Sequence, residues 1–348
     1  MVTGGTASPV GEPFFIVGND RSGTTMLRLI LDRGPDAAIP PESMFPTDFA
    51  DVFERGGPRT AADAAALMQE VWRHPKVRLW RLPGPPPQVP AGLDGRAAYR
   101  FAMEAPFRAY ARAQGKPRWG DKTPHYVHHI DPLLAVWPQA RFVVLVRDGR
   151  DVALSLRRMP FGPNNAWAAA QWWARGIRAG EQARGRHPER VLVVRYEDLA
   201  SSPREHVPRV CEFLGLAYSE DMLALERADR AKIVRDQVDW FPTLFDGVNT
   251  RAVGRWRREM RLRDRHVFEA LAGEELAALG YPVAGAPAVA LSPLRERWYR
   301  HHNELMRNVN FVRLHVFRER GRELRFALAR RLRDPARRER RGAQRAAR

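Results

Sequence analysis

A glycine-bounded loop between a short apolar run and a helical pattern constrains the fold of this chain more than any other feature. The run covers residues 13–17, the loop reads Gly18-Asn-Asp-Arg-Ser-Gly23-Thr-Thr25, and residues 26–31 carry apolar side chains at helical spacing. This order predicts a strand, a loop and a helix. The backbone N–H groups of such a loop, together with the positive end of the helix dipole, bind anions. The loop is therefore the first candidate for a ligand site.

Two further apolar runs predict additional strands. Residues 141–146 precede Asp148, a good N-cap for the helical pattern that follows, and residues 191–194 precede a helical pattern that ends at Gly215. Strands that alternate with helices predict an α/β fold, a P-loop-like parallel sheet flanked by helices. Ligands of such sheets bind at the carboxyl ends of the strands, where all three loops are expected to lie.

Long insertions separate these units. Residues 61–73, 96–114 and 167–184 are predicted to be helices, and a loop rich in Pro and Gly at 84–95 separates the first two. We expect these helical insertions to shape the side of the site that binds a second substrate. The tryptophans of the third helix are expected in the core, with a wall of the substrate pocket as the alternative; they are Trp167, Trp172 and Trp173.

The charge of the chain is unevenly distributed. Residues 295–348 contain 18 basic and 6 acidic side chains, so this segment contributes +12 of the total of +18 and leaves +6 for the rest. Of the 58 basic residues four are lysines, which leaves 54 arginines. Such a bias is typical of genome-wide composition, so the basicity does not favour a nucleic-acid partner.

The remaining composition favours a cytoplasmic enzyme. With 44% hydrophobic residues the chain can bury one substantial core, and it has no run of about 18 apolar residues that could cross a membrane. The opening MVTGGTASPVG has neither the basic start nor the apolar centre of a secretory signal. Cys211 is the only cysteine, so an internal disulfide is excluded and a cytoplasmic location is the simplest expectation.

The first loop departs from the nucleotide-binding pattern GxxxxGK[ST] at one informative position. Thr24 stands where that pattern has lysine, which a kinase or a nucleoside triphosphatase needs against the terminal phosphates. A donor with a single 5′-phosphosulfate has less charge to neutralise, and Arg21 inside the loop can supply the cation. An ordinary polar turn is the alternative.

The segment Arg21-Ser22-Gly23-Thr24-Thr25 resembles the 5′-phosphosulfate loop of sulfotransferases that use 3′-phosphoadenosine-5′-phosphosulfate (PAPS). The similarity looks closest to the bacterial and protein-tyrosine sulfotransferases. It implies that these five residues bind the 5′-phosphosulfate of PAPS. We accordingly divide the chain into a flexible tail at 1–12, a sulfotransferase catalytic domain at 13–285 and an Arg-rich helical extension with a disordered end at 286–348.

A second anion anchor is expected after the strand at 141–146. Arg147 follows this strand and Ser155 lies on the next helix, and a guanidinium with a hydroxyl can bind a separate phosphate. The resemblance assigns both residues to the 3′-phosphate of PAPS. A surface ion pair of Arg147 with Asp148 or Asp151 is the alternative.

Lys122 is the candidate for the cation that acts in the transition state. It lies in WGDKTPHY, where Thr123 suits an N-cap and Pro124 a first helical position, so we expect it in a loop just before a helix. The segment is similar to a Lys-x-Pro segment of protein-tyrosine sulfotransferases, which implies that Lys122 stabilises charge on the leaving 5′-phosphate. A solvated loop lysine is the alternative.

Glu42 is the candidate general base. Transfer to a hydroxyl requires a base near the phosphosulfate loop, and Glu42 follows two prolines after the helix that leaves this loop. Related sulfotransferases place a glutamate in the same region. A structural pairing of Glu42 with an arginine such as Arg28 is the alternative, and His125 is the reserve base. His125, His128 and His129 share a face but complete no known ligand pattern, so we expect no metal site.

Two weaker features complete the expected donor site. Tyr196, in the segment RYEDL, stands where the family contacts the nucleotide, and Arg255 lies in a Gly-Arg-Trp segment similar to one that closes over PAPS. The RKG triplet of many cytosolic members is missing, which argues against the branch that acts on small phenols and steroids.

The sequence thus predicts in-line transfer from PAPS, with 3′-phosphoadenosine-5′-phosphate (PAP) as the product, to a hydroxyl acceptor. A glycan, a lipid-linked sugar, a natural product and a peptide tyrosine all fit as the acceptor. A P-loop kinase and a non-catalytic protein that binds an anionic partner are the competing hypotheses. The Arg-rich segment carries Trp298, Leu305, Val309 and Val312 on one stripe, and the tail is expected to pack partly on the core or on a second subunit. A homodimer and a contact of the basic tail with an anionic membrane surface stay open.

Overall fold

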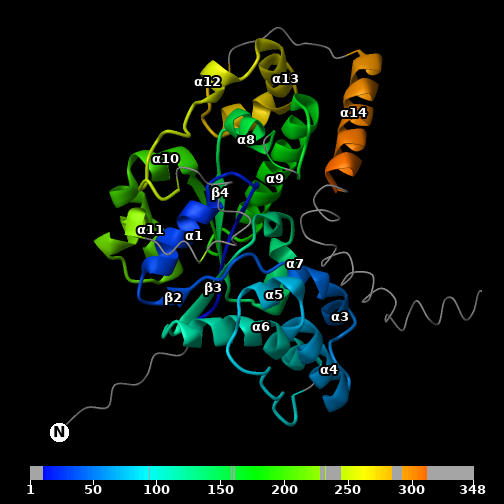
Figure 1. Cartoon of the computed structure of the whole chain (residues 1–348), viewed down its shortest axis with the longest axis vertical. Helices are drawn as coiled ribbons and strands as arrows, with labels where there is room; N and C mark the ends of the chain where they lie inside the picture. The colour runs from blue at the N-terminus through cyan, green and yellow to red at the C-terminus, as the bar shows by residue number, and fades with distance from the viewer. Residues whose placement is uncertain are drawn as a thin grey trace, which may run out of the picture.

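The fold is a five-stranded parallel sheet between two layers of helices (Figure 1). The computed structural model describes residues 11–93, 95–157, 159, 161–227, 232, 244–283 and 292–311. The strand order is β2-β3-β1-β4-β5, and every neighbouring pair is parallel. The predicted α/β class with a parallel, helix-flanked sheet is confirmed.

The strands are β1 (Phe14–Gly18), β2 (Ala37–Ala38), β3 (Arg118–Lys122), β4 (Arg141–Val146) and β5 (Val191–Arg195). The prediction found β1, β4 and β5 because each is a continuous apolar run. It missed β3, whose sequence RWGDK has no apolar run although its last four residues are buried. The expectation that Lys122 lies in a loop is therefore wrong, because Lys122 is the last residue of β3.

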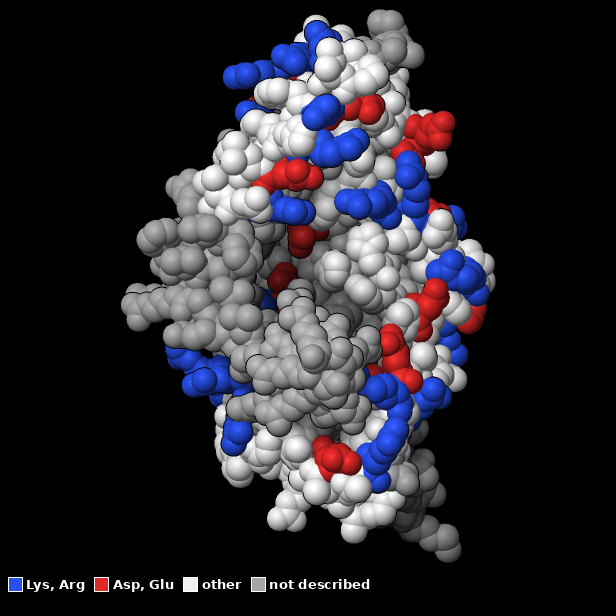
Figure 2. All heavy atoms as spheres, turned by 90° about the vertical axis from the view of Figure 1, so that its right-hand side faces the viewer, with Lys and Arg blue, Asp and Glu red and all other residues white. Residues whose placement is uncertain are grey.

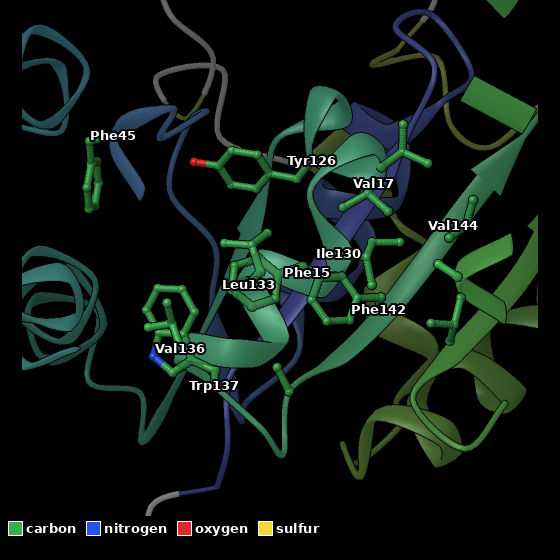
Figure 3. Close-up of a cluster of buried hydrophobic side chains, with 14 of the residues drawn as sticks. Phe15, Val17, Phe45, Tyr126, Ile130, Leu133, Val136, Trp137, Phe142 and Val144 are labelled. Carbon is green, nitrogen blue, oxygen red and sulfur yellow. The ribbon is translucent and has the colours of Figure 1, made fainter. Parts of the chain in front are cut away.

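The alternation of side chains along β1 divides the core between the two faces of the sheet. Phe15 and Val17 point into the larger cluster, together with Phe142 and Val144 of β4 and the aromatic rings of Tyr126 and Trp137 (Figure 3). Phe14 and Ile16 point to the other face, where they meet the helices that follow β1 and β5. Since both faces are covered, the strands need apolar side chains at every position.

The helices that follow β1, β4 and β5 cover the sheet or pack on the helices that cover it. They are α1 (Thr24–Arg33), α8 (Gly149–Leu156), α9 (Ala166–Arg186), α10 (Tyr196–Ser201), α11 (Pro203–Leu214), α12 (Trp256–Glu259) and α13 (Leu262–Ala278), with short 3-10 turns η2 (Glu220–Leu223) and η3 (Leu225–Arg227). Asp148 accepts a hydrogen bond from the N–H of Arg150 as the expected N-cap of α8, and α11 ends at Gly215 as expected.

The insertion between β2 and β3 forms a helical lobe beside the sheet (Figure 1). It contains α2 (Phe45–Asp48), α3 (Ala50–Glu54), α4 (Ala61–Trp72), α5 (Pro75–Leu79) and α6 (Gly95–Ala113). Between β3 and β4 follow the 3-10 helix η1 (Pro124–His128) and α7 (Ile130–Val136). The helices predicted at 61–73, 96–114 and 167–184 are confirmed within two residues at each end.

Helix α14 (Pro293–Phe311) packs on α9 through a face other than the apolar stripe identified in the sequence. Tyr299 is the buried contact, whereas Trp298, Leu305 and Val309 are 56%, 63% and 42% exposed. These three residues of the apolar stripe are thus exposed although α14 itself packs on α9, and Val312 lies outside the described residues. The domain boundary predicted at 285 also lies outside them.

The described part of the chain contains no helix that is both long and apolar enough to cross a membrane. On the face shown in Figure 2, basic and acidic side chains are intermixed. The strongly basic segment identified in the sequence continues from α14 into residues outside the described part.

Candidate functional site

The loop between β1 and α1 adopts a backbone that only its particular residues allow. Gly23, the N-cap of α1, has a φ of 94°, and a Cβ atom there would lie 2.3 Å from the ring of Tyr196. A larger residue is therefore excluded both by its backbone and by this ring. Arg21 also has a positive φ of 70°, which costs about 1–3 kcal/mol and is typical of functional loops. Thr24 and Thr25 follow in the first turn of α1, where both are buried.

Two buried hydrogen-bond donors of the site have no partner among the described residues. They are the hydroxyl of Ser22, in the first loop, and Nε of Arg147, directly after β4. A buried donor without a partner costs about 1–3 kcal/mol, so such groups are expected where a ligand accepts the bond. Phosphate oxygens are acceptors of this kind.

Arg147 joins the first loop to the second. Its Nη1 donates to the backbone carbonyl of Arg21 at 3.0 Å, and its Nη2 donates to the carbonyl of Ala252. Arg21 in turn donates from Nε to the Ser155 hydroxyl at 3.0 Å. The structure thus brings Arg21, Arg147 and Ser155 into one cluster. The alternative of an ion pair on the surface differs from the structure, in which Arg147 is only 6% exposed and its 3.9 Å ion pair with Asp151 is buried.

Tyr196 and Trp173 both contact Arg147 of this cluster. Arg147 lies over the Tyr196 ring, with 4.7 Å between the guanidinium carbon and the ring centroid. The indole N–H of Trp173 donates to the carbonyl of Arg147 at 3.0 Å, and the carbonyl of Trp173 accepts a bond from the side chain of Asn19 at 3.0 Å. Trp173 is fully buried, as expected of a core residue, and it also connects the two loops.

Glu42 and Lys122 form an ion pair at the end of β3. Lys122 Nζ lies 2.6 Å from Glu42 Oε1, and the two side chains are 5% and 33% exposed, respectively. The alternative pairing of Glu42 with Arg28 is not seen, because Arg28 donates to the carbonyls of Ile39 and Lys232. Burial alone would raise the pKa of Glu42, but the charge of Lys122 and the hydrogen bond that it donates hold this pKa below its usual value.

Two aspartates near this pair escaped the sequence analysis. Asp20 lies in the first loop, and Asp121 precedes Lys122 in β3. Burial, followed by the charge of Glu42, raises the pKa of Asp20 to about 7. Burial likewise raises the pKa of Asp121 to about 7. Asp20 carried a usable signal, since a carboxylate inside an anion-binding loop is unexpected.

His125 and Arg255 make their contacts away from the Glu42–Lys122 pair. The Nε2 atoms of His125 and His129 are 3.1 Å apart, and burial lowers the pKa of His125. Arg255 forms two hydrogen bonds to Glu259 within α12, at 2.8 and 2.6 Å. Among the described residues, no three His, Cys, Asp or Glu side chains are arranged to hold a metal ion.

The chain matches known proteins over most of its length. The model of the sulfotransferase family matches residues 13–220. Nodulation protein NoeE of Sinorhizobium fredii is 27% identical over 300 residues, which cover 79% of this chain and 67% of that protein. A putative protein-tyrosine sulfotransferase of Caenorhabditis briggsae is 26% identical over 248 residues, which cover 70% of this chain and 79% of that protein.

The fold also has solved counterparts. The sulfotransferase domain of the Synechococcus PCC 7002 olefin synthase superposes with a TM-score of 0.50 at 23% identity. The match covers 79% of this chain and 96% of that domain.

Proposed function

The chain belongs to the sulfotransferase family and is a sulfotransferase; we propose that it takes the sulfuryl group from PAPS and transfers it to a hydroxyl acceptor. The observation that carries the choice of donor is a pair of buried donors, Ser22 Oγ and Arg147 Nε, which lie on two loops in direct contact and have no hydrogen-bond partner in the described part of the chain. PAPS carries an anionic group at each end of one nucleoside, and two adjacent anion anchors fit such a ligand.

The first loop is proposed to bind the 5′-phosphosulfate. The backbone N–H groups at the start of α1 and the hydroxyls of Ser22, Thr24 and Thr25 supply hydrogen bonds, and Gly23 keeps the loop open to a close approach. Arg21 contributes the positive charge.

The second loop is proposed to bind the 3′-phosphate. Arg147 and Ser155 form this anchor, and Tyr196 holds the guanidinium in place. Arg255 is proposed only as a contributor to the edge of the site, since its guanidinium is already bonded to Glu259.

Glu42 and Lys122 are proposed to perform the acid–base and electrostatic work. Glu42 accepts the proton of the acceptor hydroxyl while the new oxygen–sulfur bond forms. Lys122 stabilises the negative charge that develops on the leaving 5′-phosphate as the old sulfur–oxygen bond breaks. The ion pair keeps Glu42 ionised and therefore ready to accept a proton. His125 is proposed as the reserve base.

A kinase is the competing enzyme class, and a binding experiment separates the two. Thr24 leaves the loop without the lysine that nucleoside triphosphates need. In a thermal-shift comparison, PAP at about 100-fold its dissociation constant should stabilise the protein by roughly 2.7 kcal/mol, and ATP or GTP by much less. A larger shift with Mg-ATP than with PAP would contradict the proposed donor.

The acceptor is proposed to be a hydroxyl on a small molecule, a glycan or a peptide tyrosine. The lobe from α2 to α6 and helix η1 follow Glu42 and Lys122 in the chain, so they are the proposed acceptor side. Transfer of ³⁵S from labelled PAPS to representatives of each class, with Glu42→Gln as the control, would identify which hydroxyl is sulfated.

A further inference from the structure

A fully buried polar network lies beneath the Glu42–Lys122 pair. The Ser43 hydroxyl donates to Asp121 Oδ2 at 2.5 Å, and the Thr123 hydroxyl donates to Asp121 Oδ1 at 3.2 Å. The Tyr126 hydroxyl lies 2.9 Å from Ser43 Oγ, and the Ser43 N–H donates to Thr123 Oγ1 at 3.2 Å. None of these four residues is more than 1% exposed.

The directions of these hydrogen bonds are fixed by the carboxylate. When Asp121 is ionised it only accepts, so the protons of Ser43 and Thr123 then both point toward it. The Ser43 oxygen is then free only to accept, so the Tyr126 hydroxyl donates to it. With Asp121 ionised, the network therefore has one arrangement, in which the donors converge on Asp121.

The network connects the two chain segments that carry the ion pair. Ser43 is the residue after Glu42, and Asp121 and Thr123 are the residues before and after Lys122. These segments are 80 residues apart in the sequence at Glu42 and Lys122. The bonds to Ser43 thus attach the backbone that carries Glu42 to the end of β3.

A gain in the free energy of unfolding does not explain why a carboxylate is buried at position 121. Burying an ionised group is costly, and well-packed apolar residues of similar volume are often equally stabilising or better. The raised pKa of Asp121, about 7, reflects this cost, although the bonds from Ser43 and Thr123 oppose it. A complete polar network specifies one geometry, which is what a catalytic pair requires.

We propose that Ser43, Asp121, Thr123 and Tyr126 are positioning residues that set the distance and orientation between Glu42 and Lys122. This inference rests on the proposed roles of that pair in sulfuryl transfer. The four residues touch neither the pair's charged atoms nor the anion loops by any hydrogen bond in the described structure, so they act through the backbone.

The test uses variants that remove a hydroxyl with little change of shape. Ser43→Ala and Thr123→Val each lose two of the network bonds described above, and Thr123→Ser keeps the hydroxyl. Turnover is measured as release of PAP from PAPS with water as the acceptor, and PAP binding is measured by calorimetry. We expect Ser43→Ala and Thr123→Val to lower kcat by between about 10- and 100-fold, with the Kd for PAP within about twofold of wild type. Thr123→Ser should retain most of the activity.

A matched control separates positioning from loss of stability. Glu104 is also buried and accepts a hydrogen bond from the Trp137 indole, but it lies in α6, away from the pair. At a similar loss of Tm, Glu104→Gln should leave kcat within about twofold of wild type. An equal loss of kcat in Glu104→Gln and Ser43→Ala would overturn the proposal.

The second readout is whether the effects of two substitutions on kcat are additive. If Ser43 acts through the ion pair, Ser43→Ala should lower kcat much less in a Lys122→Ala background than in the wild type. An equal effect in both backgrounds would overturn the positioning role. Failure of the wild type to bind PAP would instead refute the proposed donor, whereas wild-type binding and turnover with an unaffected Ser43→Ala would refute the positioning role alone.

Discussion

Lys122 Nζ lies 2.6 Å from Glu42 Oε1, so the candidate base and the candidate catalytic cation are directly paired. Lys122 ends β3, and Glu42 belongs to the segment between β2 and α2. In the proposed mechanism, the pairing connects the residue that accepts the proton of the acceptor hydroxyl with the residue that stabilises charge on the leaving group. A substitution of either residue can therefore be tested through its effect on the other.

Removal of the Lys122 ammonium should slow turnover more than it weakens donor binding. Lys122→Ala is expected to lower kcat by about 100-fold or more, by analogy with loss of an oxyanion-hole donor, because the charge on the leaving phosphate is no longer compensated. The Kd for PAP, measured by calorimetry, should rise far less than kcat falls, since the two anion loops supply most of the contacts to the phosphates of PAP. Near-wild-type turnover together with normal PAP binding would show that Lys122 has a different role.

The pH dependence of turnover should reveal the influence of Lys122 on Glu42. In the wild type, the pKa of Glu42 is held below its usual value of about 4.3, so the acid limb of the kcat/KM profile should lie at low pH. In Lys122→Met the charge and the hydrogen bond are lost while burial remains. The acid limb should therefore move to higher pH. An acid limb that stays in place in Lys122→Met would mean that Glu42 is not the titrating base.

Asp20 should make donor binding depend on pH near neutrality. Its pKa is raised to about 7, so the carboxyl is neutral below this pH and negative above it. A negative charge in the anion-binding loop repels a phosphate, and PAP affinity should fall severalfold as the pH rises from about 6 to 8. Titration of the PAP phosphates affects the wild type and Asp20→Asn alike, so the difference between the two isolates Asp20. Parallel pH profiles for both proteins would contradict this prediction.

The parts of the candidate site that lie close together in the sequence could be predicted from the sequence. Arg21, Ser22 and Gly23 lie in one loop, and Arg147 and Ser155 lie in one strand–helix unit, so periodicity and motif spacing find them. β3 was missed because RWGDK has a glycine and charged residues, and these are tolerated in a central strand only through partners elsewhere. Asp121, for example, accepts its strongest hydrogen bond from Ser43, 78 residues away in the sequence.

The ion pair itself was not predicted, because it also joins residues that are far apart in the sequence. Glu42 and Lys122 were each identified from their surroundings, yet their contact depends on the parallel pairing of β2, β3 and β1. The alternative of a solvated loop lysine does not hold, because Lys122 ends a strand and is only 4% exposed. Glu42 and Lys122 therefore form one ion pair only because the pairing of strands far apart in the sequence brings them together.

Trp173 should hold the two anion anchors at the distance that PAP requires. Its indole donates to the Arg147 carbonyl, and its own carbonyl accepts from Asn19, so α9 connects both loops. Trp173→Phe keeps an aromatic ring and removes only the first bond. An unsatisfied buried carbonyl costs about 1 kcal/mol or more, and the loosened Arg147 should weaken PAP binding by roughly 5- to 10-fold.

Trp172→Phe is the matched control for this change, because Trp172 is the neighbouring residue of α9 and is only partly buried. It should leave the Kd for PAP unchanged. Since the loops would be displaced relative to each other, Trp173→Phe should also weaken PAP more than it weakens inorganic phosphate, which needs only one anchor. Equal losses for PAP and for phosphate would show that Trp173 supports each loop separately and does not set the distance between them.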